Sequence, residues 1–153
     1  MIGFGRELVA RLRDGPAADG LERVLWGLLL AGSVTILGLA LWLEPDPRGV
    51  GTHEQLGLAP CGLVQLCGLP CPSCGFTTTF SLAAHGRWWA AFVNQPFGFV
   101  LFVATLASIP VSWLACWRGF SLLALIDRWP WGRVLGAAIA GWLAGWAYKI
   151  SSI

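Results

Sequence analysis

The chain has 153 residues, of which 56% are hydrophobic and only 12% are charged, and its formal net charge at pH 7 is +2. An ordinary soluble domain carries about 25% charged residues. The composition therefore excludes a disordered chain, a nucleic-acid-binding protein built on a basic face and a typical soluble enzyme. A mean hydropathy of +0.68 indicates instead a small, single-domain integral membrane protein.

Residues 1–23 form the first predicted element. Phe4, Leu8 and Leu12 recur at helical spacing, with arginines opposite them, and Asp14 to Pro16 break the pattern. We expect a cytoplasmic amphipathic lead-in. It either lies on anionic lipid or is an ordinary solvated helix.

Three apolar segments predict three transmembrane helices at about 24–43, 97–117 and 134–151. The first contains 20 consecutive uncharged residues, which just cross a hydrocarbon core of roughly 30 Å. Asn94 to Pro96 delay the start of the second helix. The third run is shorter, but Lys149 can snorkel and the last four residues are uncharged. We therefore expect an all-α integral membrane protein with residues 24–153 as one membrane domain.

The positive side chains predict the orientation of these helices, because cytoplasmic loops are enriched in Lys and Arg. Seven lie before the first span or between the second and third, and three lie in the first loop or the tail. The N-terminus should therefore be cytoplasmic, and the loop 44–96 should be extracytoplasmic. At a bacterial inner membrane that side is oxidising, so disulfides persist there.

Four of the five cysteines lie within 14 residues of this outer loop: Cys61, Cys67, Cys71 and Cys74. The spacing of the last three matches the iron–sulfur triplet of radical S-adenosylmethionine enzymes, but this chain has no room for their α/β barrel. A disulfide staple, a zinc site made by all four thiols, and a thiol–disulfide redox site remain open. Against zinc, the first two cysteines are separated by five residues rather than two, and their neighbours are apolar.

Pro72 suits the first position of a helix, which makes Cys71 its N-cap, and the residues that follow predict that 74–85 are helical. An N-terminal helix position lowers the pKa of a thiol. Short interfacial helices should continue to Val93. The polar face of the predicted helix comprises Thr77, Thr78, Ser81 and His85. This face either lines a site, docks a partner or is the solvated side of an interfacial helix.

Gly141 and Gly145 form a G-x-x-x-G pair in the third apolar run. Such small residues let helices approach closely. The partner is either another membrane protein or a helix of this chain.

The order of these features resembles the "domain of unknown function 2752" family of small bacterial membrane proteins, which carries a C-P-x-C-G-[LM]-T motif. The resemblance rests on Cys61, on Gly68 to Gly75 and on Thr77, followed by a helix, a glycine and an Asn-x-Pro element before a span. It covers about residues 57–117. It implies that Cys61, Cys71 and Cys74 form the disulfide or thiol site and that Cys67 is additional. An odd number of thiols leaves one without a disulfide partner.

No Ser/His/Asp arrangement, phosphate-binding loop or intramembrane carboxylate is present in the sequence. These observations favour a non-enzymatic membrane module whose cysteine cluster acts as a structural staple or docks a partner. The alternatives are a metal or cofactor carrier and a thiol–disulfide redox module. The sequence names no cofactor: the choice is between none and zinc, with zinc the weaker alternative. The expected partners are the lipid bilayer and another membrane protein bound through the outer loop or the Gly141/Gly145 face, and no nucleic acid.

Overall fold

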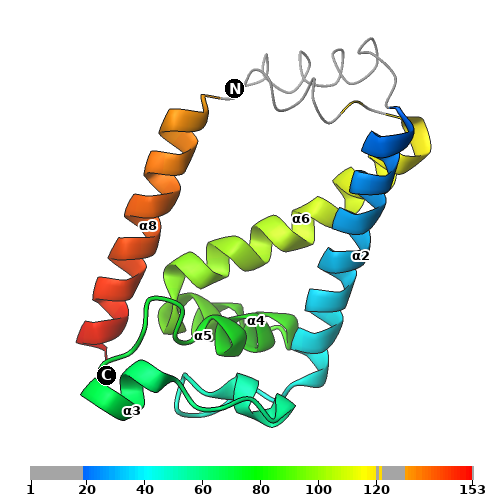
Figure 1. Ribbon diagram of the computed structural model, residues 1–153. Helices are drawn as coiled ribbons and strands as arrows, with labels where there is room; N and C mark the ends of the chain where they lie inside the picture. The colour runs from blue at the N-terminus through cyan, green and yellow to red at the C-terminus, as the bar shows by residue number, and fades with distance from the viewer. Residues whose placement is uncertain (1–18, 120, 122–129, 153) are drawn as a thin grey trace.

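The computed structural model describes residues 19–119, 121 and 130–152, and the secondary structure in these ranges is entirely helical. Three long helices frame the molecule, and short helices lie between them near one end (Figure 1). The all-α prediction is thus confirmed for the described residues. The predicted lead-in lies outside them, except for residues 19–23, which form the start of the first long helix.

The first two predicted spans are confirmed as helices to within a few residues. Helix α2 covers Gly20–Trp42, and its N-cap Asp19 accepts a hydrogen bond of 2.7 Å from the backbone N–H of Glu22. Helix α6 covers Pro96–Arg118, because Pro96 suits the first helical position and Gly119 ends the helix with a φ of 71°. Both helices are long and apolar enough to cross a membrane.

The third apolar run is also a helix, α8, which covers Trp131–Ser151. Among the described residues, however, only α2 and α6 meet the length and hydropathy expected of a membrane span, so there are two candidate spans rather than three. The reason lies in the composition of α8, since glycines, tryptophans, Arg133 and Lys149 lower its hydropathy.

The long helices run in alternating directions. The starts of α2 and α8 and the end of α6 lie at one end of the frame, and the ends of α2 and α8 and the start of α6 lie at the other (Figure 1). Helix α6 crosses obliquely from α8 to α2. Near the middle of α6, the hydroxyls of Ser33 and Ser108 lie 2.7 Å apart and join α2 to α6.

The outer loop folds into four short helices: η1 (Thr52–Leu56), α3 (Gly62–Cys67), α4 (Phe76–Ala84) and α5 (Trp88–Asn94). The sequence pattern predicted that the loop is not an extended coil, and the structure confirms this prediction. Helix α5 presents exposed apolar side chains, including Trp88 and Trp89, and α3 exposes Leu66.

A small apolar core joins α4, α5 and α6. Leu82, Ala83, Ala91 and Phe102 are buried in it, and Phe80 packs edge-on against Phe102 with ring centroids 5.5 Å apart. This core fixes the hairpin of α4 and α5 onto the start of α6.

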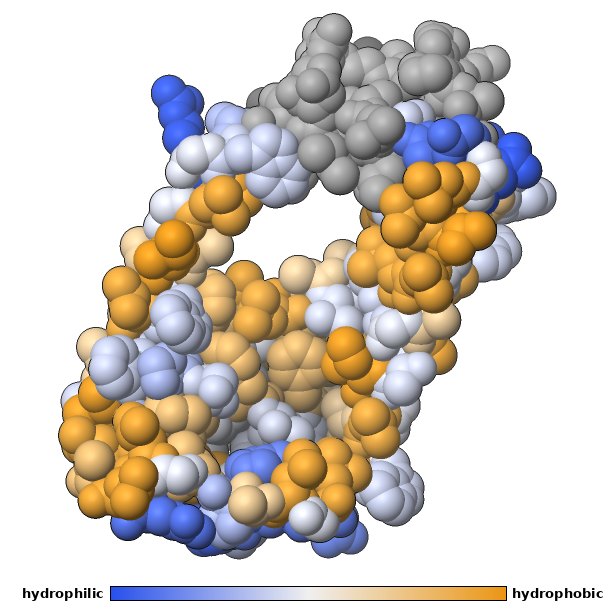
Figure 2. Space-filling model, in the orientation of Figure 1, coloured by the Kyte–Doolittle hydropathy of each residue, from blue (hydrophilic) through white to orange (hydrophobic). Residues whose placement is uncertain are grey.

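Large apolar side chains are otherwise exposed along the long helices. Figure 2 shows hydrophobic residues along their lengths and hydrophilic residues gathered at the two ends of the molecule. Such a distribution suits contact with a lipid bilayer, whose interior is apolar and whose faces are polar.

Gly141 and Gly145 face the start of α6 in the same chain. A Cβ atom at Gly145 would lie 2.8 Å from Oε1 of Gln95 and 3.0 Å from Cβ of Phe97, and one at Gly141 would lie 3.1 Å from the Phe97 ring. The close approach that the glycines allow is therefore made within the chain, so this part of the face is not free for a second protein.

Candidate functional site

Three of the cysteines converge at the end of the molecule that holds the outer loop. The Sγ atoms of Cys61, Cys71 and Cys74 all lie within 4.8 Å of one another, and those of Cys71 and Cys74 are 3.2 Å apart. Cys74 is buried and the other two are half-buried. The prediction that Cys61 approaches the Cys71–Cys74 pair is confirmed, and we call these three thiols the cysteine cluster.

The turn that carries Cys71 and Cys74 differs from the sequence prediction. Gly75 has a φ of 89° and is the N-cap of α4, so the helix begins only at Phe76. A left-handed residue interrupts the helical dihedrals, and glycine adopts this conformation without steric cost. Residues 71–74 instead form a turn closed by a 2.9 Å bond from the N–H of Cys74 to the carbonyl of Cys71. Cys71 is therefore not a helix N-cap.

This turn still places a donor against sulfur, because the backbone N–H of Cys71 donates to Sγ of Cys74 at 3.2 Å. The hydroxyl of Ser73 lies 3.3 Å from Sγ of Cys71. The third sulfur comes from the chain segment before α3, where Cys61 is the N-cap. Two separate segments thus meet at one point.

The thiols of the cluster differ in acidity. The pKa of Cys61 is lowered to about 6, because the backbone amide of Val64 and then the thiols of Cys74 and Cys71 stabilise its thiolate. The pKa of Cys74 is raised to about 12, first by burial and then by its hydrogen bonds with Cys71 and Cys61. Of these two thiols, Cys61 therefore ionises readily and Cys74 does not.

The other two cysteines lie apart from the cluster. Cys67 is the last residue of α3 and is exposed, so the four-thiol set proposed from the sequence is reduced to three. Cys116 lies near the far end of α6, where its sulfur is 4.0 Å from the carbonyl of Arg23. All five cysteines are free thiols in the structure.

The predicted polar face of α4 does not act as a unit. Thr78 and Ser81 are fully buried, whereas Thr77 is half-buried and His85 is exposed. The hydroxyl of Thr78 lies 2.8 Å from that of Thr52, and the hydroxyl of Ser81 donates to the carbonyl of Leu43. Two of the four side chains therefore attach α4 to the segment that follows α2.

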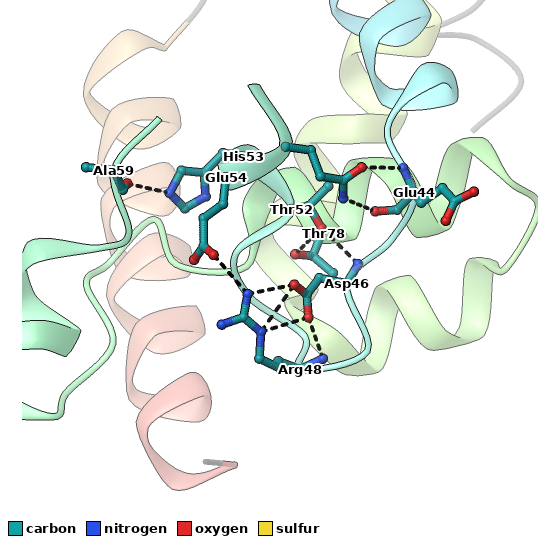
Figure 3. Close-up of polar contacts among 9 residues, drawn as sticks. Glu44, Asp46, Arg48, Thr52, His53, Glu54, Ala59 and Thr78 are labelled. Atoms are coloured by element: carbon teal, nitrogen blue, oxygen red, sulfur yellow. Dashed lines mark hydrogen bonds and ion pairs between the residues drawn. The ribbon is translucent and has the colours of Figure 1, made fainter. Parts of the chain in front are cut away.

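That segment is ordered by its own polar contacts (Figure 3). Arg48 forms ion pairs with Asp46 at 2.8 Å and Glu54 at 3.0 Å, and the backbone N–H of Asp46 donates to Thr52 at 3.0 Å. Gln55 exchanges two hydrogen bonds with the backbone of Glu44. These contacts order residues 44–55, and the contact between Thr52 and Thr78 joins the segment to α4.

Helix α8 also packs on the turn that carries Cys71 and Cys74, a contact that sequence reasoning did not predict. The indole N–H of Trp146 donates to the carbonyl of Pro70 at 2.8 Å, immediately before Cys71. The ammonium of Lys149 donates to Oδ1 of Asn94 at 2.9 Å. Lys149 was interpreted as a snorkelling side chain, but it is only 4% exposed. The sequence did offer one sign that Lys149 belongs to a site: it lies in an apolar run, where an ionisable residue is a candidate functional residue by default.

The comparisons with known proteins agree with the resemblance seen in the sequence. A family model described as "Protein of unknown function (DUF2752)" matches residues 61–109, which include the whole cysteine cluster and the start of α6. No curated protein and no solved structure matches the chain significantly. The matched segment begins at Cys61, so the family resemblance coincides with the elements that build the cluster.

Proposed function

We propose that this protein is a membrane-anchored metal-binding module in which Cys61, Cys71 and Cys74 bind one thiophilic metal ion. The observation that carries the proposal is the convergence of three sulfur atoms within 4.8 Å of one another. Thiolates bound to one tetrahedral zinc ion at about 2.3 Å lie about 3.8 Å from each other. The cluster needs only a small adjustment to reach that arrangement.

The chemistry of the ligand set supports a soft or borderline ion. Thiolates favour zinc and monovalent copper, whereas magnesium and calcium require oxygen ligands. Three protein ligands leave a fourth position for water or another ligand. Because Cys61 and Cys71 are half-buried, the ion can enter from their side.

A disulfide staple is less well supported, because it joins two thiols and leaves the third one unpaired. Thiol–disulfide exchange is the second candidate, favoured by the 3.2 Å separation of the Cys71 and Cys74 sulfurs. In that reaction a partner disulfide accepts two electrons and two protons while the Cys71–Cys74 bond forms. The third thiol, Cys61, lies close enough to attack that bond.

The experiment uses the full chain, reduced and purified in detergent, then equilibrated with Zn²⁺ or Co²⁺ and freed of unbound metal. We expect one bound ion per chain and, with Co²⁺, the intense absorption of thiolate-to-metal charge transfer. Cys61→Ser, Cys71→Ser and Cys74→Ser should each abolish or strongly weaken binding. Cys67→Ser and Cys116→Ser are the matched controls and should bind as the wild type does.

Metal removal gives a second readout. A ligand present at 100 times its dissociation constant stabilises a protein by about 2.7 kcal/mol, so a chelator should lower the unfolding temperature of the wild type and not that of Cys74→Ser. A reduced protein that binds no metal would refute the proposal. If the isolated protein is instead two hydrogen atoms lighter, with Cys71 bonded to Cys74, the redox function replaces the metal-binding function.

We further propose that α2, α6 and α8 all cross a bacterial inner membrane, with the cysteine cluster outside. The alternating directions of the three helices support this arrangement (Figure 1), and α8, with 21 residues, is about 30 Å long. The distribution of Lys and Arg supports a cytoplasmic N-terminus. The exposed tryptophans of α5 suit a position at the outer interface.

Thiol labelling of intact cells tests this topology. With Cys67 as the single cysteine, an impermeant reagent should label the protein. Arg13→Cys in a chain without other cysteines should be labelled only after the cells are opened. The reverse pattern would overturn the proposed orientation.

A further inference from the structure

Lys149 stands out because it is the only lysine of the chain and is almost fully buried. Its Nζ atom donates to three neutral oxygens: Oδ1 of Asn94 at 2.9 Å, the carbonyl of Gly49 at 3.3 Å and the carbonyl of Asn94 at 3.4 Å. No ion pair joins it to a carboxylate of the described residues. A buried ammonium is costly unless an opposite charge lies nearby.

The cysteine cluster can supply that charge, because the lysine passes close to the turn that carries Cys74. Gly75 follows Cys74 directly, and a Cβ atom at Gly75 would lie 3.4 Å from Cε of Lys149 and 3.0 Å from the Gly49 carbonyl. The left-handed glycine therefore lets the lysine stem pass against the turn of the cluster. Trp146, one helical turn earlier, bonds to Pro70 on the other side of that turn.

We infer that Lys149 is the charge partner of the cysteine cluster, and that the bound ion is divalent. Three thiolates and a divalent ion carry one net negative charge, which one ammonium neutralises. Three thiolates and a monovalent ion would carry two net negative charges, and one ammonium would leave one of them uncompensated. This inference rests on the proposed metal-binding function and adds to it the charge of the ion and a residue outside the matched segment.

The arrangement also gives α8 a role at the site. The last turns of α8 contact the cluster through Trp146 and Lys149. In the same turns, the hydroxyl of Tyr148 donates to the carbonyl of Val93 at 2.7 Å. Removal of the lysine charge should therefore weaken the metal complex without removing a ligand. Partners beyond the first ligands typically change metal affinity by about 10–100-fold.

The test compares Zn²⁺ affinity, measured by competition with a chromophoric chelator, for wild type, Lys149→Met and Tyr148→Phe in detergent. We expect Lys149→Met to bind about 10–100-fold more weakly and Tyr148→Phe, which loses a contact of α8 but no charge, to bind as the wild type does. Equal affinities for wild type and Lys149→Met, with helical circular dichroism unchanged, would overturn the inference and leave the metal site intact. A wild type that binds no metal would overturn the proposed function itself.

A second measurement applies if Lys149→Met does not fold. Because the chain has one lysine, an amine-acylating reagent modifies a single side chain, which mass spectrometry separates from the N-terminus. Zn²⁺ should slow the acylation of Lys149 in the wild type and not in Cys74→Ser. The same rate with and without Zn²⁺ would overturn the inference.

Discussion

The segment 43–95 and the long helices differ in the side chains that they bury and expose: the segment buries polar side chains, and the helices expose large apolar ones. In the segment, Thr52, Thr78 and Ser81 are fully buried, whereas on the helices Leu28 is 64% exposed and Val100 is 57% exposed. A soluble protein shows the reverse pattern. The difference indicates that the helices meet an apolar solvent, in which hydrogen bonds and close contacts of small residues, rather than the burial of apolar surface, hold the interior together.

The largest expected effect comes from placing a charge on the apolar exterior. Val34 on α2 and Leu58 in the outer loop are exposed to a similar extent, 51% and 55%. An arginine near the centre of a membrane helix costs about 2.5–3.5 kcal/mol on insertion scales. We therefore expect Val34→Arg to reduce membrane insertion, measured by the fraction of protein resistant to carbonate extraction.

Leu58→Arg is the matched control, because it adds the same charge outside the helices, and it should insert as the wild type does. If both variants insert equally well, the exterior of α2 does not face lipid, and the contrast between the two regions loses its explanation.

The next largest effect tests the buried polar side of the comparison. Thr78→Val keeps the shape of the side chain but removes the oxygen that lies 2.8 Å from the Thr52 hydroxyl. The Thr52 hydroxyl keeps the hydrogen bond that it accepts from the N–H of Asp46 but loses its second partner, and a buried polar group left unsatisfied in this way costs about 1–3 kcal/mol. Thermal or denaturant unfolding in detergent should show this loss for Thr78→Val. Thr77→Val, at the half-buried neighbouring position, should stay within about 0.5 kcal/mol of the wild type.

Most of the fold could be predicted from the sequence, since uncharged runs and helix-start signals at Pro96 and Asp19 are local. The boundary at Phe76 could not, because Pro72 is also a good helix start, and the contacts of Gly75 are made by distant residues: the side chain of Asn94 donates to its carbonyl at 3.2 Å. The inward orientation of Thr78 and Ser81 was equally hidden. A polar stripe on a short helix looks the same whether it faces water or a buried backbone.

The candidate site was predictable in part, namely where its residues are close in sequence. Cys71 and Cys74 are close in sequence, and the family resemblance singled out Cys61, so their convergence was expected. The absence of Cys67 from the cluster follows from α3, which carries it away on an exposed face. Lys149 lies 75 residues after Cys74 in the chain. Only the docking of α8 on the outer loop brings it to the cluster, and no local pattern reports that contact.

A smaller effect is expected where the two regions meet, at the contact of α8 with Gln95 and the start of α6. Gly145→Ala places a methyl group 2.8 Å from Oε1 of Gln95, which itself is fully buried. Crowding of this kind costs roughly 1–3 kcal/mol, partly offset by about 1 kcal/mol of helix propensity gained. The net loss of unfolding free energy should thus be about 1 kcal/mol.

Gly136→Ala, which meets no atom within 4 Å, should be neutral or stabilising. Equal effects of the two substitutions would show that α8 is not packed on α6.

The smallest effect is expected at the solvated edge of the polar segment, where Arg48 contacts Asp46 and Glu54. Hydrogen bonds from Arg48 lower the pKa of Asp46 below its ordinary value of 3.8. A carboxyl whose pKa is lower in the folded than in the unfolded state stabilises the fold above the unfolded value, and this contribution disappears as the pH falls through the folded value. Arg48→Ala should therefore lower the unfolding temperature slightly at pH 7 and less at pH 3. High salt should reduce the difference between variant and wild type, because the Arg48 side chain is 60% exposed.

Arg87→Ala, at another exposed position of the loop, should show no such pH dependence. An Arg48→Ala effect that is the same at both pH values and both salt concentrations would mean that Arg48 acts through packing and not through its charge.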